Sequence, residues 1–183
     1  TADSTAATGM KWAVASSSGG MTSIASGSLS GASLVLSTIS GSYKNLRLVL
    51  RNYYAASDVD LNIKFNALTT AGDYSFVFME STTTNNTASA WTSYYNGTVL
   101  GANFSLVDNT DGDNSLILDI EDYADTSANK NVYLQNEFKR STGQKTVYAA
   151  IGSVNTTSAI TTLTVTPTTA NWSAGTYILY GVN

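Results

Sequence analysis

The stretch that decides the fold is NLRLVLRNY (residues 45–53), followed after a short interval by VDLNIKFN (residues 59–66). Apolar residues occupy every second position in both segments. A period of two is typical of β-strands that bury one face and expose the other. The positions predicted to face inward are Leu46, Leu48 and Leu50 in the first segment, and Val59, Leu61, Ile63 and Phe65 in the second.

We expect these two segments to form an antiparallel hairpin joined by residues 54–57. The predicted register pairs Leu50 with Leu61, Leu48 with Ile63 and Leu46 with Phe65, because a slip of one residue would bury polar side chains. The same register places Arg51 opposite Asp60 as a cross-strand ion pair.

Further segments with strand character follow at intervals of roughly ten residues, and none has the 3.6-residue period of a helix. We therefore predict an all-β fold, a single antiparallel β-sandwich of jelly-roll type with roughly eight or nine strands. An immunoglobulin-like sandwich is the alternative. The additional predicted strands are residues 33–37, 74–79, 115–123, 132–138, 145–151, 160–166 and 176–182, and residues 98–106 are a weak strand pair or a bend.

The first part of the chain differs in composition from the rest. Residues 1–32 are rich in Ala, Ser, Thr and Gly, and SSSGG at residues 16–20 is typical of a flexible linker. We predict an extended N-terminal arm over residues 1–32 and the sandwich over residues 33–183. If the arm orders on a neighbouring molecule, Lys11, Trp12 and Met21 would contact it, with Trp12 and Met21 as apolar anchors.

Charge and residue usage argue against several classes of function. The chain has 183 residues, a net charge of -4 and only nine basic residues, without a basic cluster, so we expect no nucleic-acid partner and no membrane partner. It contains no Cys and no His, which removes disulfides, the commonest general base and the commonest transition-metal ligand. We expect no enzyme activity and no cofactor.

Two groups of carboxylates are candidate chemical sites. The loop at residues 108–113 (DNTDGD) holds oxygen ligands that suit calcium, although its spacing differs from an EF-hand and a solvated turn is the alternative. Asp119 and Glu121 share one face of a predicted strand, about 7 Å apart. That separation suits a glycosidase pair, but the solvent face of a strand accounts for them better. We assign neither group a metal or a catalytic role.

Aromatic residues at loops and strand ends form the remaining candidate site. Exposed Tyr and Trp stack on sugars and anchor protein interfaces, whereas Tyr is also an ordinary residue of half-buried strands. The candidates are Tyr53, Tyr54, Trp91, Tyr94 and Tyr95.

Several segments, in order along the chain, resemble virion proteins of tailed bacteriophages. The strongest is the ending WSAGTYILYGV (residues 172–182). The others are YKNLRL (43–48), IKFN (63–66), IEDY (120–123) followed by Lys130, and residues 153–165, which include NTTSAI.

This resemblance implies a jelly-roll sandwich without catalytic residues. It implies a capsid decoration (cement) protein at the virion surface, bound to the major capsid protein and to itself as a homotrimer. The alternative is a receptor-binding module of a tail or head fibre that contacts glycans through its aromatic loops.

Overall fold

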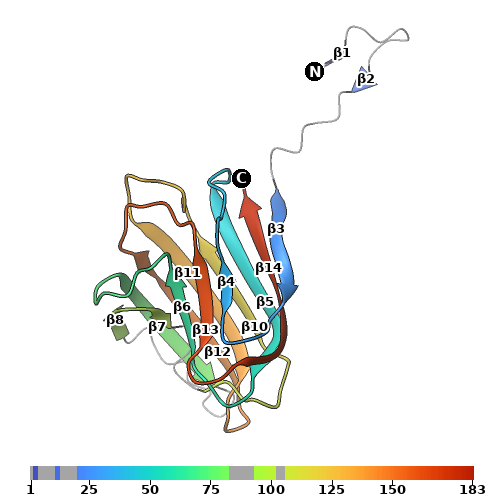
Figure 1. Ribbon diagram of the computed structural model, residues 1–183, viewed down its shortest axis with the longest axis vertical. Helices are drawn as coiled ribbons and strands as arrows, with labels where there is room; N and C mark the ends of the chain where they lie inside the picture. Colours follow the sequence, from blue (N-terminus) through green and yellow to red (C-terminus); the bar gives the residue numbers. More distant parts are fainter. Residues whose placement is uncertain (1, 4–10, 13–19, 83–92, 102–105) are drawn as a thin grey trace.

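The computed structural model describes residues 2–3, 11–12, 20–82, 93–101 and 106–183, and every regular element in them is a β-strand. Two antiparallel sheets pack face to face (Figure 1). The larger sheet, in spatial order, contains β3 (Met21–Ser28), β14 (Trp172–Val182), β5 (Asn45–Ala55), β10 (Ser115–Ile120), β11 (Lys130–Lys139), β12 (Lys145–Val154), β7 (Tyr74–Thr82) and β8 (Ser93–Gly97). The smaller sheet contains β4 (Leu34–Leu36), β13 (Leu163–Pro167), β6 (Leu61–Phe65) and β9 (Leu100–Gly101).

The order of pairing defines a jelly roll. The chain folds back on itself so that β3 pairs with β14, β4 with β13, β5 with β10, and β6 with β9. The first and third of these strand pairs lie in the larger sheet, and the second and fourth lie in the smaller sheet. The folded-back chain therefore wraps into a two-sheet sandwich. The prediction of an antiparallel β-sandwich of jelly-roll type is confirmed.

Four strands extend the jelly roll on one side. β11 and β12 follow β10 in the chain, whereas β7 and β8 follow β6, and the four join the larger sheet in the order β11, β12, β7, β8. The larger sheet therefore has eight strands and the smaller sheet four. The two sheets together have twelve strands, more than the eight or nine predicted; β3 and β8 were not expected, and β9 lies in residues 98–106, where a weak strand pair or a bend was expected.

The predicted hairpin between residues 45–53 and 59–66 is wrong. β5 pairs with β10 and β14 in the larger sheet, whereas β6 pairs with β13 and β9 in the smaller sheet. The chain crosses the sandwich between them, so Arg51 and Asp60 are not opposite each other. The predicted inward faces are nevertheless correct, because both sheets turn their apolar residues toward one shared core.

The sandwich also begins earlier than residue 33. β3 lies within the predicted arm and pairs with β14 along its whole length, and Leu29, which follows it, is buried in the core. Before β3, the structure describes β1 (Ala2–Asp3) and β2 (Lys11–Trp12), which pair with each other. No helix in the described ranges is long and apolar enough to cross a membrane.

Candidate functional site

Strands β7 and β12 are apolar on both faces, which is unusual for a sheet with one face toward water. Phe76 and Tyr148 point into the core, whereas Val77, Val147 and Ile151 point outward and are 38%, 52% and 45% exposed. We call the outward-facing group the outer apolar face. Its members are Val77, Met79, Ile117, Tyr133, Val147, Ala149 and Ile151.

Strand register brings these residues together from four strands. Val77 is the cross-strand partner of Ile151, which in turn is the partner of Tyr133. In the next row, Met79 is the partner of Ala149. A shallow depression of about 350 Å³ lies among Met79, Ile117 and Tyr133, with Gln135 and Asp119 also in its lining.

The outward positions of β7 and β12 that surround this depression carry no charge. On β7 they are Ser75, Val77, Met79 and Ser81, and on β12 they are Val147, Ala149, Ile151 and Ser153. Burial of such a surface against a partner removes little charge from water, and the free-energy cost of desolvation is therefore small. The arrangement suits a protein interface better than a catalytic cleft.

An ion pair borders the outer apolar face on the side of β5. Arg47 Nε and Nη2 donate to the two carboxylate oxygens of Asp119 at 2.6 and 2.8 Å. The hydrogen bond to Asp119 raises the pKa of Arg47. The two side chains are 40% and 32% exposed, so the pair contributes at most about 1 kcal/mol to stability. Both oxygens of Asp119 are engaged by Arg47, while Glu121 lies beyond the end of β10.

The acidic loop at residues 108–113 consists of local turns. Asp108 accepts hydrogen bonds from the backbone N–H and the hydroxyl of Thr110, and these bonds lower its pKa. Asp111 accepts from the backbone N–H of Asp113 and lies 3.3 Å from Lys139 Nζ. No cluster of three potential metal ligands occurs in the described part of the chain.

Tyr53 is not available for an interface, contrary to prediction. Its side chain is fully buried, and its hydroxyl donates to Asn136 Oδ1 at 2.5 Å. The cause lies in β5, where Asn52 adopts a left-handed conformation (φ 52°). Before Asn52 the even-numbered side chains of β5 face the core, and after it the odd-numbered side chains do. Tyr54 is consequently only partly buried, on the opposite face.

The other predicted contact residues are not gathered into one site. Met21 is 53% exposed on β3, at the edge of the larger sheet opposite β8. Tyr94 and Tyr95 belong to β8, where their backbones pair with Val77 and Phe76. Lys11 and Trp12 form β2. Trp91 lies outside the described residues.

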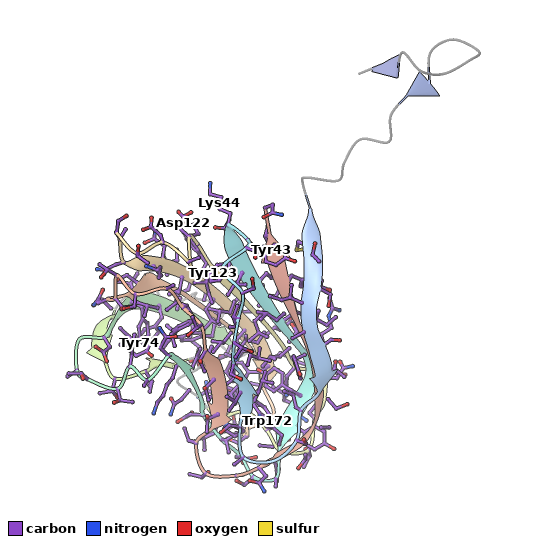
Figure 2. All side chains as sticks on the ribbon, turned by 45° about the horizontal axis from the view of Figure 1, so that its top comes forward. Tyr43, Lys44, Tyr74, Asp122, Tyr123 and Trp172 are labelled. Carbon is purple, nitrogen blue, oxygen red and sulfur yellow. The ribbon has the colours of Figure 1, made fainter. Side chains whose placement is uncertain are left out.

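The segments on which the predicted phage resemblance depends pack at both ends of the sandwich. Figure 2 shows Tyr43 and Tyr123 at one end and Trp172 toward the other. The ring of Tyr43 lies against Gly181, where an added Cβ atom would be 2.2 Å from Tyr43 Cγ. The hydroxyl of Tyr123 donates to the Ser40 carbonyl oxygen and accepts from the Tyr43 backbone N–H at 3.4 Å.

The same end is closed by two polar side chains. Asn66 Oδ1 accepts from the backbone N–H groups of Thr161 and Thr162. The fully buried Lys130 donates to two backbone carbonyl oxygens, those of Ala128 and Thr156. Both side chains hold loops in place at this end of the sandwich.

Comparison of the chain with protein-family models, with curated proteins and with solved structures gave no match. The choice of the outer apolar face as the candidate site is therefore based on its geometry and composition. Sequence reasoning missed it, although FVFM (residues 76–79) and VYAAI (residues 147–151) are apolar at consecutive positions. Such runs indicate a strand covered on both faces.

Proposed function

We propose that this chain is a non-catalytic structural protein of a tailed-phage virion, which decorates the capsid and stabilises it through protein contacts. The observation that supports this proposal is the outer apolar face on β7, β11 and β12. Exposed apolar surface gathered in one place on a folded domain is characteristic of protein interaction sites. The segments resembling phage virion proteins direct the proposal toward a capsid.

The proposed partners are the major capsid protein and further copies of the same chain, as a homotrimer. Low charge on the outer apolar face favours both, because two identical uncharged surfaces meet without like-charge repulsion. A closed trimer would match the threefold positions of a capsid shell.

The test is binding of the purified chain to capsid shells assembled without it, measured by co-sedimentation. Val147→Lys combined with Ile151→Lys should abolish binding, because two charges would have to be buried at the contact. Both positions are exposed, so thermal unfolding should change little. The matched control is Thr142→Lys in the exposed β11–β12 turn, which should bind as the unaltered chain does.

Failure of the unaltered chain to bind any shell would contradict a decoration role. Binding that survives both lysines would remove the outer apolar face from the proposal. The glycan-binding alternative stays a prediction, since it depends on Trp91 and on the side chains of β8.

A further inference from the structure

Strand β3 is an edge strand without the usual protection. Among the described residues it pairs only with β14, and it forms the border of the larger sheet (Figure 1). Edge strands commonly carry Lys, Pro or inward-pointing charges that prevent pairing with another chain. The sequence of β3, MTSIASGS, contains no charged residue and no proline. Its outer backbone groups are a template for an additional strand.

A groove of about 480 Å³ lies beside this edge, between β3 and β4. The two strands are the borders of their respective sheets on the same side of the sandwich. The groove reaches Leu36 and Leu179 of the core, and Ile24 and Val35 form its walls. Val35 is 57% exposed, so the groove is an apolar opening in the side of the sandwich.

The lining of the groove suits an uncharged occupant. A β-bulge at Ile24 interrupts the register, since Leu179 pairs with Ala25 whereas Tyr180 pairs with Ser23, and Ile24 joins the groove. At the rim lie hydroxyls of the loop that leads from β4 to β5, and the described lining includes no charged side chain. The rim residues are Ser37, Thr38, Ser40, Ser42 and Tyr43.

The chain contains a segment with the complementary pattern. In MKWAV (residues 10–14), Met10, Trp12 and Val14 alternate with Lys11 and Ala13, so a strand there would present three apolar side chains on one face. When a strand is added to a sheet edge, backbone hydrogen bonds give affinity and pockets for alternate side chains give specificity.

We propose that residues 10–14 of a second copy add as a strand to the free edge of β3 and insert Met10, Trp12 and Val14 into the groove. Six residues, 15–20, join this segment to β3, and an extended chain of that length spans about 20 Å, enough to reach the edge of a molecule packed beside this one. In the structure, β2 pairs with β1 and lies away from β3 and β4 (Figure 1). Exchange of identical arms links copies into a symmetric assembly. The inference concerns self-association and does not require capsid binding.

Cross-linking of single-cysteine variants tests this inference cleanly, because the chain has no cysteine of its own. Val14→Cys places one thiol in the arm, and Ser37→Cys places another at the groove rim. The two variants are made separately, mixed and treated with a short thiol-reactive cross-linker. The expected product has twice the chain mass and forms at least about ten times more than with the control partner Thr142→Cys. Adding Trp12→Ser to the Val14→Cys chain should reduce it to the control level.

Two results would overturn the inference. The first is a cross-link that forms within one chain in the Val14→Cys/Ser37→Cys double variant at high dilution, while the mixed pair stays at the control level. That result would place the arm on its own groove. The second is no cross-link above control in either experiment. Either result together with intact capsid binding would reject arm exchange alone and leave the proposed function in place.

Discussion

A single left-handed residue decides which tyrosine of the Tyr53–Tyr54 pair lies in the core. Asn52 has φ 52°, a conformation that Asn tolerates better than most residues. The alternation of inward-facing side chains along β5 shifts by one residue there, so Tyr53 faces the core. Its ring packs edge-on against Trp172, with ring centroids 6.0 Å apart. Gly175 (φ 124°) accommodates this contact, because a Cβ atom there would lie 2.7 Å from Tyr53 Cβ.

Removal of the Tyr53 hydroxyl should destabilise the fold. Tyr53→Phe takes away the donor to Asn136, which is itself buried, at an expected cost of about 1–3 kcal/mol in the free energy of unfolding. Urea denaturation measures this change. Tyr54→Phe, at the half-buried neighbour, is the matched control and should change stability by less than about 0.5 kcal/mol. Equal effects of the two substitutions would contradict the assignment of Tyr53 to the core.

At the scale of elements, β3 belongs to the sandwich and the residues before it are a separate segment. β3 covers the side of β14, where Leu179 pairs with Ala25 and is 1% exposed. The strand has few large apolar residues of its own. Its place in the sheet depends on backbone pairing with β14.

Two truncations distinguish β3 from the segment before it. Deletion of residues 1–20 should leave the thermal midpoint within a few degrees at low protein concentration. Deletion of residues 1–28 should cost at least about 2 kcal/mol, the free energy of re-exposing one buried leucine, because Leu179 loses its cover. Calorimetry of both truncated chains measures the difference. Equal stability of the two would show that β3 contributes nothing to the sandwich.

At the scale of the molecule, the core contains several fully buried tyrosines, three of them on strands of the larger sheet and Tyr123 in the connection that follows β10. Burial raises the pKa of Tyr74 to about 12, partly offset by its hydrogen bond with the Phe65 backbone N–H. Burial likewise raises the pKa of Tyr53, Tyr123 and Tyr148 above the ordinary value. The folded state therefore favours the neutral phenol more strongly than the unfolded chain does.

This difference makes stability fall in alkali. Below about pH 10 the phenols are neutral in both states, and their contribution is fully present. As the pH rises from about 10 toward the raised folded values, ionisation favours the unfolded chain, and the free energy of unfolding declines. Urea denaturation between about pH 8 and 11, with tyrosinate absorbance as a second signal, measures this. Constant stability together with tyrosines that all titrate near pH 10 would contradict their burial.

The sequence by itself determined which residues face inward. Its period of two correctly placed Leu46, Leu48, Leu50, Ile63 and Phe65 in a core, because alternation follows directly from strand geometry. It also indicated a jelly-roll sandwich. The candidate contact residues were less predictable, since the phase change at Asn52 is a backbone event with no periodic signal.

Only the tertiary structure decided which strands pair. The inward faces of both sheets meet in one core, so β5 and β6 bury their apolar residues equally well as hairpin partners or as members of opposite sheets. The pairing depends instead on strands distant in sequence, such as β14 beside both β3 and β5. The outer apolar face arises in the same way, because Val77, Tyr133 and Ile151 become neighbours only when β7, β11 and β12 join one sheet.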